Sequence, residues 1–197
     1  MLTRDRQQGV SMIEVLVAIM ILTVGLLGAA GMQSRLQVAE VEAYQRAQAI
    51  VLLQDMVDRI NNNRAKTQIE AYVTTDPLGT ASSYTGSNCA APANIVVRDK
   101  CEWEAALLGA AEKKAGTSTN LGAMGGARGC ISNPVTTMPR EVEVAVVWQG
   151  ITPTRAPTNT TCGQNQYGDE KYRRALVAKI KIGCLQNDAG TGLCVTP

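Results

Sequence analysis

A single carboxylate stands at the head of a membrane-length apolar segment, and this pairing limits what the chain can become. Glu14 is followed by eighteen residues, Val15 to Met32, none of which carries a charge. A charged side chain in hydrocarbon costs about 2.5 to 3.5 kcal/mol even on the gentler insertion scales. We therefore expect Glu14 either to lie at the membrane interface or to have a partner of opposite charge.

Cleavage after Gly9 would supply that partner. The cut places a new α-amino group on Val10, four residues before Glu14 and so on the same face of a helix. A basic leader that ends in glycine, then an apolar residue, then glutamate at the fifth mature position, resembles the signal of type IV pilins and type II secretion pseudopilins. The resemblance implies that a prepilin peptidase cuts between Gly9 and Val10 and methylates Val10, and that Glu14 docks on the terminus of a neighbouring subunit.

Two simpler interpretations of the segment fit less well. An ordinary secretory signal has an apolar core of about 7 to 15 residues that is discarded, whereas here the run is longer and the cut precedes it. A plain membrane anchor explains the length but not the glutamate. Arg4 and Arg6 precede the run, which keeps the leader cytoplasmic and sends the rest of the chain across the membrane to the periplasm.

Composition narrows the function further. The formal net charge of +2 indicates no nucleic-acid surface, and the chain contains no histidine, which excludes catalysis that uses histidine as a base. No cofactor is expected, and no metal is expected because no cysteine pair has the C-x-x-C spacing. A membrane-anchored enzyme is the weaker alternative, since acidic pairs such as Glu141 with Glu143 and Asp169 with Glu170 read as solvated surface.

Apolar residues continue at helical spacing beyond Met32, so one helix is predicted from about Ser11 to Ile60. Its apolar stripe is Leu36, Ala43, Ala47, Ile50, Leu53, Val57 and Ile60, and its polar face includes Gln37, Glu40, Gln45, Gln48, Gln54 and Asp58. Residues 61–63 are asparagines that tolerate a left-handed C-terminal cap. At about 1.5 Å per residue the helix would be roughly 75 Å long, over twice the bilayer core. The outer half should therefore pack on a C-terminal domain.

The rest of the chain predicts a small antiparallel sheet of three or four strands. Residues 67–129 read mostly as loop, with one helix capped by Asp99 and ended by Gly116. Strands are predicted at 142–148, half-buried through its alternating valines, and at 176–182, with a shorter one starting at Cys130. A long polar loop, 150–172, connects the first two, and the long helix should cover the sheet's apolar side.

Six cysteines lie in the exported part, which suits disulfides in an oxidising compartment. Six cysteines allow fifteen pairings. If the three strands form a meander, Cys130 and Cys162 lie at one end of the sheet and Cys184 at the other. Nearest-neighbour pairing is therefore predicted, and it joins Cys89 to Cys101, Cys130 to Cys162 and Cys184 to Cys194.

Several stretches resemble the PilV-type minor pilins, also called type IV pilus modification proteins. They are residues 11–18 (SMIEVLVA), 25–28 (GLLG), 55–60 (DMVDRI) with Asn63-Arg64, Cys101-Glu-Trp103, and the strand at 142–148. Gly25, Gly28 and Gly31 either permit close helix packing or allow local melting. In major pilins a proline commonly occupies the position of Gly31, so its absence favours a minor subunit.

The resemblance implies an α+β, pilin-like fold and a non-enzymatic role in the complex of minor pilins. That complex is implied to prime pilus assembly and to cap the tip. Its implied partners are other minor pilins, the major pilin, the prepilin peptidase, the inner-membrane assembly platform and a tip adhesin. The chain would lie in the inner membrane before assembly and in the pilus afterwards. A type II secretion pseudopilin is the alternative.

The expected segments are a leader (1–9), a membrane or filament-core helix (10–32), its amphipathic half (33–63) and a periplasmic domain (64–197) whose sheet begins near residue 129.

Overall fold

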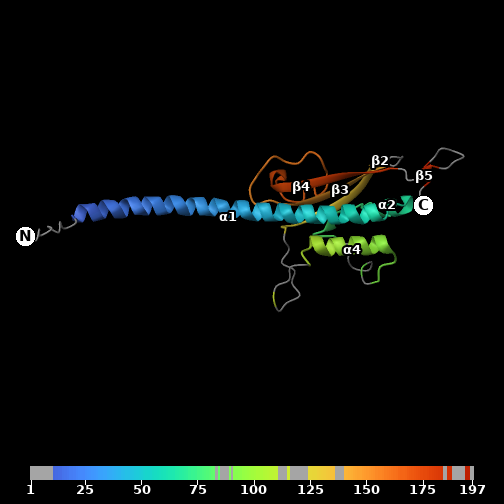
Figure 1. Ribbon diagram of the computed structural model, residues 1–197, viewed down its shortest axis with the longest axis horizontal. Helices are drawn as coiled ribbons and strands as arrows, with labels where there is room; N and C mark the ends of the chain where they lie inside the picture. The colour runs from blue at the N-terminus through green and yellow to red at the C-terminus, as the bar shows by residue number, and fades with distance from the viewer. Residues whose placement is uncertain are drawn as a thin grey trace, which may run out of the picture. The chain divides into compact units, whose positions relative to one another are not determined.

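The computed structural model describes residues 11–82, 84, 89, 91–110, 115, 124–135, 140–183, 186–187 and 194–195. The chain divides into two compact units, Met1–Val41 and Glu42–Pro197. Helix α1, Met12–Asn62, contributes residues to both units (Figure 1). The other elements belong to the second unit and are α2 (Lys66–Tyr72), β1 (Leu78–Gly79), α4 (Ile95–Leu107), β2 (Arg128–Val135), β3 (Arg140–Gln149), a 3-10 helix (Glu170–Tyr172), β4 (Arg173–Ile182), β5 (Gln186–Asn187) and β6 (Cys194–Val195).

The predicted long helix is confirmed to within two residues at each end, but its C-terminal cap differs from the prediction. The non-glycine residues with positive φ in the described part of the chain are Ala81 and Asn165, so residues 61–63 form no left-handed cap. Instead, the Asn63 side-chain amide donates to the Arg59 carbonyl at 3.1 Å. It also donates to the Tyr72 hydroxyl at 3.1 Å, which ties the end of α1 to α2.

The face of α1 that is buried in the second unit is only partly the predicted stripe. The buried residues are Gln45, Ala49, Leu53, Met56 and Ile60, whereas Ala43 and Ala47 are exposed. The helix is apolar on two faces here, and the sheet covers the one that carries Met56. Gln45, predicted on the polar face, is buried as a consequence, and its side-chain oxygen has no hydrogen-bond partner among the described residues.

The main sheet has four antiparallel strands in the order β1-β2-β3-β4, so β2, β3 and β4 form the expected meander. Ile131 of β2 lies opposite Val144 of β3, and Val144 lies opposite Ala178 of β4. The register of β2 shifts between Ser132 and Val135, beside Pro134, which cannot donate a ladder hydrogen bond. β5 and β6 pair in a separate two-stranded sheet.

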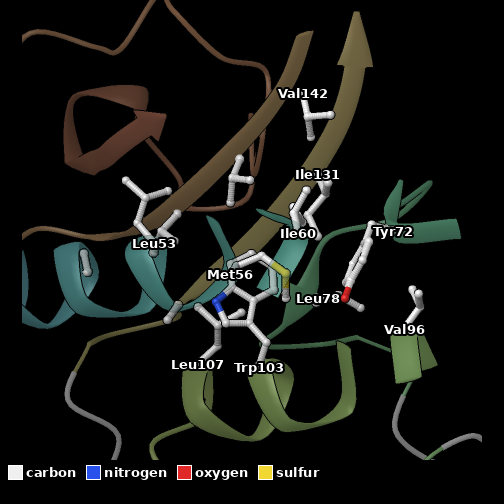
Figure 2. Close-up of a cluster of buried hydrophobic side chains, with 14 of the residues drawn as sticks. Leu53, Met56, Ile60, Tyr72, Leu78, Val96, Trp103, Leu107, Ile131 and Val142 are labelled. Carbon is white, nitrogen blue, oxygen red and sulfur yellow. The ribbon is translucent and has the colours of Figure 1, made fainter. Parts of the chain in front are cut away.

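The main core lies between this sheet, the second half of α1, and α4 (Figure 2). Val142, Val144 and Val146 of β3 join one cluster with Met56 and Trp103. The Trp103 indole donates to the Leu52 carbonyl at 2.8 Å, which fastens α4 to α1. A Cβ atom at Gly129 would lie 2.2 Å from the Trp103 ring, so only glycine lets the indole lie on β2.

The predicted bounds of the second helix are wrong at both ends. α4 begins at Ile95, and its N-cap is Asn94, whose side chain accepts from the Val97 amide at 3.0 Å. The helix ends at Leu107, well before Gly116. Asp99, expected to be the cap, lies inside the helix at 4 % exposure and takes part in a partly buried ion pair with Arg59. The capping-box spacing was therefore misleading, because Asp99 serves a tertiary contact rather than the helix terminus.

Strand β3 is buried on both faces over its second half, which corrects the prediction of a half-buried strand. Ala145 and Val147 pack with Cys162 and Tyr167 in a second apolar cluster on the face opposite the main core. The segment 150–172 thus covers the back of the sheet. Arg173, at 2 % exposure, holds that segment by donating to three of its backbone carbonyls, those of Pro157, Thr160 and Cys162.

Two short elements, α2 and β1, lie in the segment predicted to be loop. Ile69 and Tyr72 of α2 and Leu78 of β1 are buried in the main core. Their local sequence has little periodicity, so tertiary burial rather than propensity accounts for them. Together the long apolar helix, the small antiparallel sheet and the disulfides confirm the predicted α+β, pilin-like architecture.

Matched substitutions can test which face of α1 is buried in the core of the second unit. Ile60→Ala should lower the free energy of unfolding by about 2 to 5 kcal/mol, because it opens a cavity at a fully buried site. Ile50→Ala removes the same atoms from a side chain that is 40 % exposed, so its loss should be much smaller. Urea unfolding of the two variants in detergent, followed by tryptophan fluorescence, measures the difference. Equal losses would show that the buried face is assigned wrongly.

Candidate assembly site

Glu14 lies in the first turn of α1, where a negative charge is favoured by the helix dipole. The Ser11 carbonyl accepts hydrogen bonds from the Glu14 and Val15 amides at 3.0 and 3.3 Å and starts the helix. The Glu14 side chain is exposed and forms no ion pair within the described residues. Gly9 and Val10, the predicted cleavage and methylation sites, lie outside those residues.

The apolar segment that follows Glu14 is exposed along its whole length within its own unit. Leu16, Ile19, Leu22 and Leu26 are each more than half exposed, and none of the most apolar window is buried. By length and composition the helix could cross a membrane. Cβ atoms added at Gly25, Gly28 or Gly31 would meet nothing within 4 Å, so no close packing within their own unit of the described chain requires these glycines.

Glu42 is a second polar feature of α1, at the start of the second unit. One of its carboxylate oxygens accepts from the Ile151 and Thr152 amides at 3.1 and 2.8 Å and from the Thr152 hydroxyl at 2.7 Å. The same oxygen pairs with the Arg174 guanidinium at 3.1 Å. Arg174 lies across Gly150, where a Cβ atom would come within 2.5 Å of it. These contacts fasten the loop after β3 and the start of β4 to the helix.

Arg59 is the third polar feature of α1, and it joins the helix to α4. Its guanidinium contacts Asp55 at 3.0 Å, Asp99 at 3.0 Å and Glu102 at 2.6 Å. The Tyr72 hydroxyl donates to the other oxygen of Asp99. Burial and the Asp99 carboxylate raise the pKa of Tyr72, which favours the protonated phenol that donates this hydrogen bond. The cluster therefore fixes the junction of α1, α2 and α4.

Among the described residues, two disulfides link segments that are separated in the sequence. Cys89 is bonded to Cys101 of α4, with Cα atoms 5.5 Å apart, and Cys130 of β2 is bonded to Cys162, with Cα atoms 5.9 Å apart. These are two of the pairs that nearest-neighbour pairing gives. Cys184 lies outside the described residues, and so does its expected bond to Cys194. A disulfide of this kind typically raises the free energy of unfolding by about 2 to 4 kcal/mol.

The acidic pairs weighed as catalytic candidates are engaged in ion pairs. Glu141 and Glu143 both contact Lys179, at 3.1 and 3.6 Å, and Glu170 contacts Arg173 at 2.6 Å. Glu141, Glu143 and Glu170 are partly buried, whereas Asp169 is exposed and lies 3.8 Å from Lys171. Within the described residues no group of three or more potential ligands could hold a metal ion.

Comparison with known proteins gives one match, to the prokaryotic N-terminal methylation motif over residues 4–30. It spans Gly9, Val10 and Glu14 and most of the exposed apolar segment. No curated protein and no solved structure matches the chain. The motif indicates a prepilin of the kind that type IV pilins and pseudopilins share. Such prepilins are processed by a prepilin peptidase and assemble with pilus or pseudopilus partners. The motif and the fold fit a membrane-anchored structural subunit.

Sequence reasoning missed the charged residues that connect α1 to the other elements of the second unit. Glu42 and Arg174 are 132 positions apart, so no local pattern joins them. Asp55 and Arg59 have the i, i+4 spacing of a helical ion pair, and this signal could have been read. Their contact with Asp99 could not, because it depends on where α4 packs.

Removing the Glu42 carboxylate should loosen the loop that it holds. In Glu42→Ala the amides of Ile151 and Thr152 lose their acceptor, so their hydrogen exchange should speed up by about tenfold. Glu40→Ala, two residues earlier on an exposed side chain, should leave those rates unchanged. Exchange read by mass spectrometry on the full chain in detergent checks both. Unchanged rates in Glu42→Ala would show that the loop does not depend on this contact.

Proposed function

We propose that this chain is a minor pilin of a type IV pilus, of the PilV type, that acts in the complex priming pilus growth and lies near the tip. The observation that carries the proposal is the methylation motif with Glu14 in the first turn of a long apolar helix. In this proposal, a chain with this N-terminus leaves the membrane and enters a filament.

The proposed sequence of events begins at the leader. The prepilin peptidase cuts between Gly9 and Val10 and methylates the Val10 amine, while the helix anchors the chain in the inner membrane. Residues 64–197 fold in the periplasm against residues 33–63. On assembly, Glu14 pairs with the terminal amine of a neighbouring subunit, and residues 10–32 pass from lipid into the filament core. The partners would be other minor pilins, the major pilin, the assembly platform and a tip adhesin.

The PilV-type assignment is supported by the structural roles of the shared motifs in the fold. Arg59, from the 55–60 stretch, lies at the centre of the ion-pair cluster. Trp103, from Cys101-Glu-Trp103, is fully buried and bonded to α1. Trp148 ends the apolar face of β3 at 4 % exposure. The resemblance therefore falls on residues that shape the second unit, as well as on the N-terminal motif common to all prepilins.

The intact mass of the protein from membranes and from sheared surface filaments tests the proposal. We expect a chain that starts at N-methylated Val10 in both fractions. Retention of residues 1–9 would contradict prepilin processing. A correctly processed chain that is missing from sheared pili, with deletion affecting only protein secretion, would instead identify a pseudopilin.

The role of Glu14 has its own test. Glu14→Ala should be cleaved and inserted normally but should fail to enter the filament, because the docking charge is lost. Ile13→Ala, next to it but uncharged, should be incorporated as the wild type is. Immunoblots of membrane and sheared-filament fractions compare the two variants. Normal incorporation of Glu14→Ala would show that the charge is not needed for assembly.

A further inference from the structure

A pocket of about 310 Å³ lies in the second unit, between α1 and the sheet. Ligand pockets usually measure about 300 to 1,000 Å³, so this one is at the lower end and has room for one or two side chains of a partner. The residues that give its wall its chemistry are Glu42, Ala43 and Arg46 of α1, Trp148 of β3, and Arg174 and Leu176 of β4.

Two of the three charged groups in the wall, Glu42 and Arg174, neutralise each other. Their side chains form an ion pair at 3.1 Å. The Arg174 guanidinium also donates to the Thr154 hydroxyl at 2.7 Å and to the Lys171 carbonyl at 3.1 Å. The same Glu42 oxygen accepts from two amides of the loop after β3. This pair therefore belongs to the fold and leaves no excess charge for a ligand.

Arg46 supplies the third charge, and the fold leaves it uncompensated. Glu42 lies four residues before it, the spacing of a helical ion pair, but Glu42 is directed to Arg174 and the loop instead. The Arg46 side chain is exposed, and within the described ranges it has no hydrogen-bond or ion-pair partner. Two arginines and one glutamate give the wall a net charge of +1. The remaining residues three or four positions from Arg46 carry no charge and are Ala43, Ala49 and Ile50.

The strands supply an apolar part of the wall. Trp148 is almost fully buried, so its ring is held in place, and Leu176 is only partly buried at the border of the main core. Leu176 lies opposite Val146, two residues before Trp148, so the two side chains share one face of the sheet. An apolar wall lowers the local dielectric and strengthens the attraction between a guanidinium and an anion. The pocket thus combines one available cation with an apolar surface.

The charge of the pocket restricts its occupant. A nucleic acid binds through many lysines and arginines, whereas this wall offers only Arg46. A phosphorylated side chain carries about −1.5 to −2 at pH 7 and would exceed the charge of one arginine. A second copy of the pocket would bring Arg46 against Arg46. A carboxylate carries a single charge, and a guanidinium binds it through two parallel hydrogen bonds.

We propose that this pocket binds an aspartate or glutamate side chain of another protein, together with an apolar side chain next to it. The carboxylate pairs with Arg46, and the apolar group lies against Trp148 and Leu176. The proposal rests on the proposed function in one respect, namely that the other protein is a second subunit of the same filament. Binding itself needs no filament, so it is tested on the isolated chain.

The peptide acetyl-Leu-Glu-Leu-amide is the probe, and acetyl-Leu-Gln-Leu-amide is its uncharged control. The chain has two tryptophans, so two indole N–H signals are followed by NMR of the full mature chain in detergent. The Trp148 signal should shift and saturate with the glutamate peptide, because Trp148 lines the pocket. The Trp103 signal should stay in place, since that ring is fully buried. The glutamine peptide should bind about tenfold more weakly, because it lacks the charge.

Matched variants identify the charge that binds. Arg46→Gln should weaken binding of the glutamate peptide about tenfold. It should fold as the wild type does, because the Arg46 side chain is exposed. Arg98→Gln removes the same charge from an exposed position on α4. It lies outside the pocket, so binding should stay within about twofold of the wild type.

Several results would each overturn the proposal. They are the absence of a saturable Trp148 shift, equal binding of the two peptides, equal shifts of the two indole signals, and unchanged binding in Arg46→Gln. A dimer of the full chain that Arg46→Gln abolishes would also overturn it, because the pocket would then belong to a self-interface. All of these are read without pili, so they are distinct from absence of the chain from sheared filaments, which contradicts the proposed function.

Discussion

The packing of one face of α1 against the inner face of β3 is the interaction on which the second unit depends. Ala49, Leu53, Met56 and Ile60 share one apolar cluster with the inward valines of β3. Neither surface could stay in water alone, since a helix stripe and a sheet face each need a cover. Trp103 completes the arrangement, because it fills the space above Gly129 and bonds to the helix backbone.

Charged groups fix the position of the helix that apolar packing alone would leave free to shift. Burying a charge is costly unless it is paired, and α1 pairs its charges with distant segments, Glu42 with Arg174 and Arg59 with Asp99. A shift of the helix by one turn would remove Arg59, the ion-pair partner, from the nearly buried Asp99. The apolar contacts thus supply stability, and the ion pairs specify register.

The parts of the fold with a repeating pattern could be predicted from the sequence, and those decided by distant contacts could not. The strands around Val144 and Ala178 and the extent of α1 follow from period-2 and period-3.6 apolar spacing. Asp99 was misread as a helix cap because its partner Arg59 is 40 positions away. Burial of Val147 depends on Arg173, which folds the 150–172 segment over it. For the candidate site, the motif around Glu14 is local and readable, whereas the Glu42 contacts depend on how distant segments pack together.

The exposed N-terminal half of α1 makes Glu14 the residue that would decide between lipid and filament. Its apolar side chains are covered by nothing in its own unit, so they require either hydrocarbon or other subunits. Lipid tails and a bundle of apolar helices are about equally apolar, so moving these side chains between them changes the free energy little. The charge differs, because an unpaired carboxylate is costly in lipid and a paired one is not. Under the proposed function, the apolar residues would be stable both in the membrane and in the filament core. Pairing of Glu14 would then make the transfer from membrane to filament favourable.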